Sequence, residues 1–142
     1  MLLYNEEKVA KIFSEINAAL KLLEDLKALS LEQFKKDAHK IASAKYNFIV
    51  AIEGMIDLCN HVITKNNFRE PNDYADTFRI MKEQALFDES FTAVLMQMAR
   101  FRNRLVHIYW EVDVIELHNI IQNKLRDIYE FQSRFKDIIK RK

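Results

Sequence analysis

The scarcity of residues that interrupt regular backbone constrains this chain more than any other feature. Its 142 residues include one glycine, Gly54, and one proline, Pro71, far below average usage. Because tight turns rely on such residues, this composition disfavours turn-rich β structure and favours long helices. Hydrophobic residues make up 49% of the chain, which is enough to build the core of one domain. We therefore predict a single all-α domain over residues 1–142.

Apolar residues recur with the helical period in five segments. We expect helices at about residues 5–28, 30–66, 74–84, 89–106 and 113–139, with Gly54 marking a close helix contact or a bend in the second. The expected N-caps are Asn5, Ser30, Asp88 and Asp113, and "SLEQ" at 30–33 has the capping-box pattern. Residues 65–73 are the clearest loop, and residues 107–112 are ambiguous. Short connections predict an antiparallel bundle of four to five helices.

Charge and cysteine usage narrow the protein class. Lys and Arg number 22 against 21 Asp and Glu, for a net charge of +1, which argues against a protein that coats nucleic acid but leaves room for a local basic site. The lone Cys59 falls on an apolar stripe and fits a reducing compartment. The apolar run "FIVAI" is far shorter than the ~20 residues of a membrane span, and the N-terminus lacks a secretory signal. We expect a cytoplasmic protein that does not contact a membrane.

One charged residue interrupts an apolar helix face. Leu95, Met98, Leu105 and Tyr109 recur at the spacing of one face, and Arg102 lies in the middle of it. One interpretation is a surface arginine whose aliphatic stem covers the edge of the core. The other is a partly buried guanidinium, which needs a partner because an unpaired buried charge is costly.

Candidate partners for this arginine lie on the second predicted helix. Glu53, Asp57 and His61 follow one another at i, i+4 and i+8, so they form a polar strip that could face Arg102 across a groove. An ordinary solvated helix face is the alternative.

Asp57 and His61 could also be two metal ligands, but no third ligand is obvious. With a single glycine, a phosphate-binding glycine-rich loop is impossible. We predict no metal and no cofactor.

The residues after Arg102 suggest chemistry on a phosphate. On an ideal helix His107 lies roughly 140° around the axis from Arg102, whereas Tyr109 returns to nearly the same face. His107 joins them only if the helix ends or distorts near Val106. The arginine fork matches phosphate oxygens, histidine passes protons near neutral pH, and Asn103 can orient an imidazole or bind phosphate. Such groups could cleave RNA without metal, by base-assisted attack of a ribose 2′-OH on the adjacent phosphate.

The stretch "FRNRLVHIYWEVD", residues 101–113, resembles the R-x₄-H-x-Y signature of the HepT-like branch of the HEPN superfamily. Arg102, His107 and Tyr109 match the signature, and Asn103 matches its polar position. Residues 51–63 and 72–81 are similar to two further segments of the family, in the same order. The resemblance covers about the last two-thirds of the chain.

This resemblance implies a fold, an activity and a partner. The fold would be the HEPN antiparallel helical bundle, forming a homodimer whose two motifs meet at a cleft along the interface. The activity would be metal-independent RNA cleavage by a toxin, with His107 as general base or acid, Arg102 holding the phosphate, and Asn103 and Tyr109 orienting groups. Arg100 and Arg104 would help to bind RNA. The antitoxin would be a minimal nucleotidyltransferase of the MntA type, which AMPylates the motif tyrosine.

Two rival functions remain open at the sequence level. One is a non-catalytic helical subunit that holds a nucleotide or substrate for a nucleotidyltransferase, in which Arg102 binds phosphate but His107 is not needed for turnover. The other is a purely structural helical dimer. Phe91, Phe101 and Trp110 suggest more aromatic surface than one small bundle needs, which favours a dimer in every case.

Overall fold

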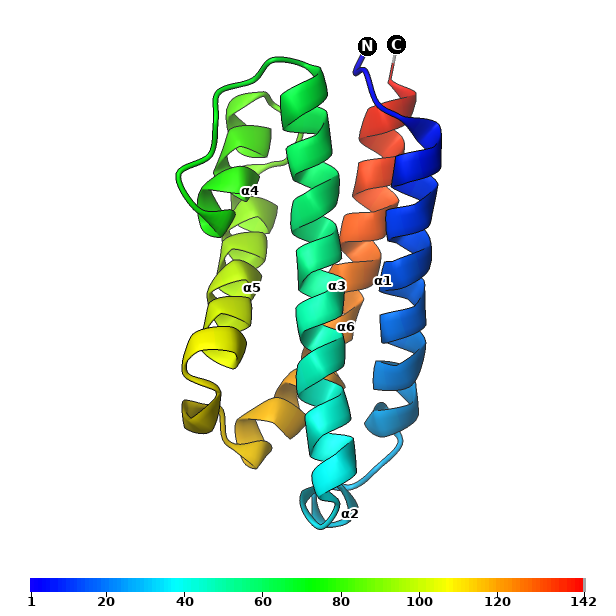
Figure 1. The fold of residues 1–142 in the computed structure, drawn as a ribbon, viewed down its shortest axis with the longest axis vertical. Coiled ribbons are helices and arrows are strands. Elements are labelled where there is room, and N and C mark those ends of the chain that lie inside the picture. Colours follow the sequence, from blue (N-terminus) through cyan, green and yellow to red (C-terminus); the bar gives the residue numbers. More distant parts are fainter. Residues whose placement is uncertain (142) are drawn as a thin grey trace.

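The protein is an elongated bundle of antiparallel helices (Figure 1). The computed structural model describes residues 1–141, and these contain helices and connections but no strand. The elements in order are α1 (Glu6–Lys27), α2 (Leu31–Lys35), α3 (Ala38–Lys65), α4 (Tyr74–Glu83), α5 (Glu89–His107), the 3₁₀ helix η1 (Tyr109–Glu111) and α6 (Val114–Lys140). The all-α prediction is confirmed. None of these helices is long and apolar enough to cross a membrane.

The predicted helix starts are confirmed by side-chain caps. The four expected cap residues each accept a backbone N–H from the first turn of the following helix, as Asn5 does from Lys8 at 2.9 Å. At Ser30 both halves of the capping box are present, because Gln33 reaches back to the Ser30 backbone N–H. These contacts satisfy donors that have no partner within the helix.

The predicted second helix, 30–66, is wrong in one respect, since the chain breaks it into α2 and α3. Asp37 leaves the helical conformation and its carboxylate accepts the backbone N–H groups of His39 and Lys40 at 3.0 and 3.2 Å. The short α2 closes the lower end of the bundle in Figure 1. There Phe34 is fully buried, with its ring against His118 of α6. Burial of Phe34 favours this turn over one straight helix.

Helix α3 is central and packs against α1, α4, α5 and α6. Five fully buried phenylalanines fill the space between these helices: Phe34, Phe48, Phe78, Phe131 and Phe135. Cys59 is buried in the core as expected, and burial raises the pKa of its thiol. The expectation that Phe91 and Phe101 add aromatic surface is wrong, because both lie in the core, whereas Trp110 is exposed.

Gly54 marks a close helix contact rather than a bend. A Cβ atom built on it would lie 2.5 Å from Cγ1 of Ile16, which projects from α1. Helix α3 runs without interruption through this position. The absence of a side chain therefore lets α1 and α3 approach closely, one residue after Glu53.

Candidate functional site

Arg102 lies on the inward face of α5, near the end of that helix. Leu95, Met98 and Leu105 on the same face are buried, and the Arg102 side chain is 12% exposed. Of the two interpretations of this arginine, the structure supports the partly buried guanidinium. Such a group requires partners, because desolvating a charge without them is costly.

Three elements surround the Arg102 guanidinium. Its Nε and Nη2 donate to Oε1 of Glu53 on α3, at 3.0 and 2.7 Å, and its Nη1 donates to Oδ1 of Asn103 at 3.2 Å. The ring of Tyr74, the first residue of α4, covers the guanidinium with its centroid 4.7 Å from Cζ. A guanidinium has five N–H donors, and three are engaged here. One N–H on Nη1 and one on Nη2 therefore have no partner within residues 1–141 and can bind a ligand.

The expected polar strip divides between two faces, so only Glu53 reaches Arg102. His61 accepts the backbone N–H of Asn5 on Nε2 at 2.8 Å, at the start of α1. Asp57 and His61 line a groove between α1 and α3, together with Lys8. The reason is geometric: residues at i and i+8 differ by about 80° around a helix axis. The expectation that all three side chains face Arg102 is wrong.

A second, solvent-facing stripe on α5 carries His107. Because α5 continues through His107, Arg100, Asn103 and His107 lie at i, i+3 and i+7 on one face. Arg100 and His107 are exposed, and neither side chain has a hydrogen bond or ion pair within residues 1–141. Asn103 links this stripe to Arg102, because its Oδ1 accepts a hydrogen bond from Arg102 Nη1. In one chain His107 stays on a different face from Arg102, since the helix does not end before it.

Tyr109 follows the end of α5 instead of continuing it. Ile108 adopts φ −137° and ψ 44°, and the 3₁₀ helix η1 begins at the next residue. The straight-helix expectation that Tyr109 shares the face of Arg102 therefore does not apply. Its side chain is 58% exposed, with its ring edge-on to Trp110 at 5.4 Å, and Lys45 Nζ lies 3.4 Å from its backbone oxygen. Another enzyme could reach its hydroxyl.

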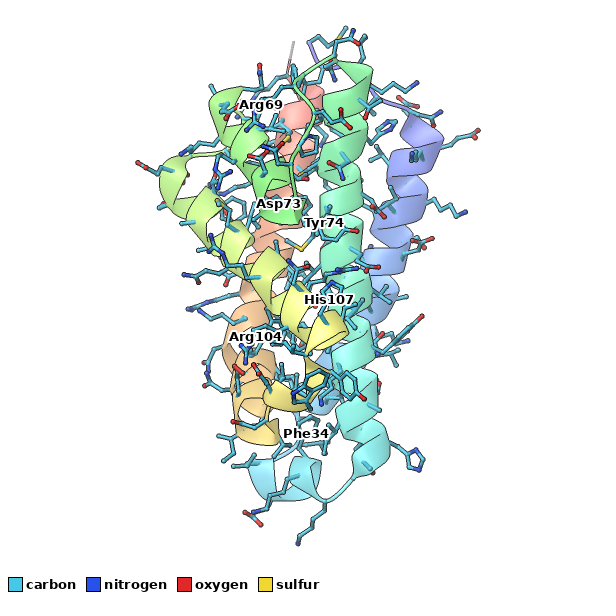
Figure 2. All side chains as sticks on the ribbon, turned by 60° about the vertical axis from the view of Figure 1, so that its left-hand side comes forward. Phe34, Arg69, Asp73, Tyr74, Arg104 and His107 are labelled. Carbon is cyan, nitrogen blue, oxygen red and sulfur yellow. The ribbon has the colours of Figure 1, made fainter. Side chains whose placement is uncertain are left out.

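Arg104 is engaged elsewhere. Both terminal nitrogens donate to Glu116 of α6, at 2.8 and 2.7 Å, and this carboxylate raises the pKa of the guanidinium. Being two residues from Arg102, it points to a different side of α5. Figure 2 shows Arg104 beside α6, below His107. The structure does not bring Arg104 together with the other candidate residues.

Sequence reasoning missed Tyr74. It precedes Arg102 by 28 residues and belongs to another helix, so no periodic pattern joins the two. Within residues 1–141 no group of three or more His, Cys, Asp and Glu side chains is placed to hold a metal ion. The groups available for chemistry are the Arg102 guanidinium, with two N–H donors that have no partner among the described residues, and an exposed imidazole nearby along α5. Such groups bind a phosphate and transfer a proton.

Comparison with known proteins identifies the family. A family model described as Ribonuclease HepT-like matches residues 16–135. This chain belongs to the HepT-like ribonuclease family. An HepT-like relative, the mRNA nuclease HepT of Shewanella oneidensis, is 28% identical over 99 residues, which is 70% of this chain and 74% of the relative.

Several solved structures share the fold of this chain. A toxin–antitoxin complex with AMP-PNP contains a chain that superposes with a TM-score of 0.85 at 22% identity, covering 92% of this chain and 98% of that one. The tri-AMPylated HEPN toxin of Shewanella oneidensis, in complex with its MNT antitoxin, gives 0.84 at 23% identity, covering 92% and 97%. The cytosolic protein YutE of Bacillus subtilis, of unknown function, gives 0.82 at 19%, covering 98% and 93%. The predicted HEPN helical bundle is confirmed.

Proposed function

We propose that this chain is a metal-independent endoribonuclease and the toxin of a toxin–antitoxin pair. The observation that carries the proposal is the guanidinium of Arg102, which contacts Glu53, Asn103 and Tyr74. In the part of the chain that the structure describes, one N–H on each of its terminal nitrogens has no partner. Two such donors on one guanidinium can bind the oxygens of a phosphodiester. Family membership and the mRNA nuclease relative support RNA as the substrate.

The reaction follows from the groups at the end of α5. The His107 imidazole takes the proton of a ribose 2′-OH, and the 2′-oxygen attacks the adjacent phosphorus. The bond to the 5′-oxygen breaks, and that oxygen receives a proton from an imidazolium or from water, which leaves a 2′,3′-cyclic phosphate and a 5′-OH end. Arg102 stabilises the negative charge that develops on the phosphorane oxygens. Asn103 holds Arg102 and faces the stripe that carries His107.

A homodimer would complete this site. In one chain Arg102 and His107 lie on different faces of α5. A two-fold contact along the end of α5 would place the His107 stripe of each subunit opposite the Arg102 region of the other. Exposed apolar side chains are available for this contact: Tyr46, Val106 and Trp110. Arg100 lies on the same stripe and adds positive charge for the RNA backbone.

The proposed antitoxin is a minimal nucleotidyltransferase that transfers AMP from ATP to the Tyr109 hydroxyl, releasing pyrophosphate. The exposure of this side chain supports the assignment, as do the solved complexes of related toxins with MNT antitoxins. The added phosphate would bring negative charge to the end of α5. There it would repel the RNA backbone and occupy the cleft of the proposed dimer, as phosphorylation switches act through added charge.

The test is RNA cleavage by the purified protein in EDTA. General acid–base catalysis contributes about 10²- to 10⁴-fold, so His107→Ala should lose about that factor. His39→Ala, at an exposed histidine at the start of α3, is the matched control and should cleave normally. Arg102→Lys should also be poor, because a single ammonium does not replace the planar fork.

The same experiment separates the nuclease from the non-catalytic binding subunit. The imidazole of His107 has no orienting hydrogen bond within residues 1–141, which is the observation that favours the binding subunit. Under that alternative, His107→Ala would leave RNA or nucleotide binding intact and no cleavage would be seen with either protein. Activity that requires a metal, or full cleavage by His107→Ala, would contradict the mechanism proposed above.

A further inference from the structure

The contact between Tyr74 and Arg102 joins two helices at the candidate site. Figure 2 shows Tyr74 at the start of α4 and His107 near the end of α5 on the same side of the molecule. Glu53 and Asn103 bind the guanidinium through its N–H groups, whereas Cζ of Arg102 lies over the Tyr74 ring, 4.7 Å from its centroid. In-plane hydrogen bonds leave both faces of a guanidinium open, so the ring supplies a restraint that those partners do not.

The backbone around Tyr74 is anchored by hydrogen bonds and ion pairs of its neighbours. Asp73 caps α4 by accepting the backbone N–H of Asp76 at 2.7 Å. The Asp76 carboxylate is buried, and it accepts two bonds from Arg69 at 2.7 and 2.8 Å and the backbone N–H of Asn72 at 2.9 Å. Charge-assisted bidentate pairs of this kind fix geometry as well as adding energy. The loop before α4 and the first turn of that helix are therefore anchored next to Tyr74.

We propose that Tyr74 is a positioning residue for the reaction: its ring restrains the orientation of the Arg102 guanidinium, so that the two N–H groups without a partner within residues 1–141 are already oriented when an RNA phosphate binds. This inference rests on the proposed ribonuclease function. The attraction between a guanidinium and an aromatic face favours the placement of Cζ over the ring. A donor fork that is already oriented loses less entropy when the phosphate binds, and this advantage carries into the transition state.

Two substitutions separate the aromatic face from the hydroxyl group. Tyr74→Phe keeps the ring and should retain the wild-type kcat/KM. Tyr74→Leu removes the π-face and should lower kcat/KM about 2- to 30-fold, the range that corresponds to measured cation–π contributions. Tyr129→Leu is the matched control, because Tyr129 is exposed to a similar extent and its hydroxyl contacts Glu24 on α1, not the site. Tyr74→Met is a second variant without the ring, should the leucine variant not fold.

A readout independent of activity tests the positioning directly. Because Cζ of Arg102 lies over the Tyr74 ring, 4.7 Å from its centroid, the NMR resonance of the neighbouring Nε–H should carry a ring-current shift. That shift should persist in Tyr74→Phe and disappear in Tyr74→Leu, while far-UV circular dichroism stays unchanged. In the His107→Ala background, Tyr74→Leu should weaken binding of a short RNA. With Arg102→Ala also present, Tyr74→Leu should have no further effect, because coupled residues are not additive.

The outcomes distinguish this inference from the function on which it rests. If Tyr74→Leu cleaves RNA with the same kcat/KM as the wild type, the positioning role is overturned and the proposed ribonuclease function still holds. If Tyr74→Leu weakens RNA binding by the same factor when Arg102→Ala is also present, the positioning role is overturned as well, because the effect then does not act through Arg102. No RNA cleavage by the wild-type protein would overturn the proposed function, and the positioning role with it.

Discussion

Replacing Gly54 by alanine should destabilise the protein, although alanine is the better helix former. The new Cβ would lie 2.5 Å from Cγ1 and 3.0 Å from Cδ1 of Ile16, and Ile16 is fully buried. Overpacking of a core costs typically ~1–3 kcal/mol. Replacing a mid-helix glycine by alanine gains about 1 kcal/mol. The difference predicts a net loss of unfolding free energy of roughly 0–2 kcal/mol.

The same substitution should change sign when Ile16 is shortened. Ile16→Ala removes both clashing atoms, and the next neighbour of the new Cβ, Cγ2 of Ile12, is at an ordinary distance of 3.6 Å. Ile16→Ala alone should cost about 2–5 kcal/mol through the cavity it creates. In that background Gly54→Ala should stabilise the protein by up to ~1 kcal/mol, because the helix-propensity gain is no longer offset.

The assay is urea unfolding followed by far-UV circular dichroism, for the wild type, both single variants and the double variant. All four proteins are compared at one concentration, since the stability of a dimer depends on it. The predicted coupling free energy is about 1–3 kcal/mol, well above the error of a double-mutant cycle. A Gly54→Ala effect of the same sign and size in both backgrounds would refute the close-contact explanation.

Three further predictions address the partner, the assembly and pH. Incubation with a cognate nucleotidyltransferase, ATP and Mg²⁺ should add AMP units to the wild type but not to Tyr109→Phe, as read by intact-protein mass spectrometry; an adduct that persists in the variant would contradict the assignment. Light scattering should give about twice the 16.9 kDa of one chain, and a monomer mass that stays constant on concentration would exclude the homodimer. Burial, together with Lys8 and Lys65, lowers the pKa of His61, whose neutral ring accepts the Asn5 N–H. The contribution of His61 to stability should therefore be complete above pH ~6.5, the pKa of an unfolded histidine, and should decrease as the pH falls below this value. The decrease in melting temperature should be smaller in His61→Gln. An equal pH dependence of the two melting temperatures would contradict this role.

Local sequence determines the helices and most of their ends. Helical periodicity and the near absence of glycine and proline are short-range properties, and N-caps such as Asn5, Asp88 and Asp113 act within one turn. The break at Asp37 was also indicated locally, because Asp is a favoured N-cap residue. The apolar pattern continues across this position, however, and it favoured one unbroken helix. The order of Arg102, Asn103, His107 and Tyr109 is also readable in sequence, and it carries the family resemblance.

Partners across the bundle were decided only by the tertiary structure. The apolar stripes show which side of each helix is buried, but hydrophobic burial is not directional and leaves open the rotation and sliding of one helix against another. The packing of α3 against α5 settles this rotation and sliding, and it places Glu53, and not Asp57 or His61, against Arg102. Helix packing likewise brings Tyr74 to the guanidinium and Arg104 to Glu116, contacts that short-range spacing cannot encode because they join different helices.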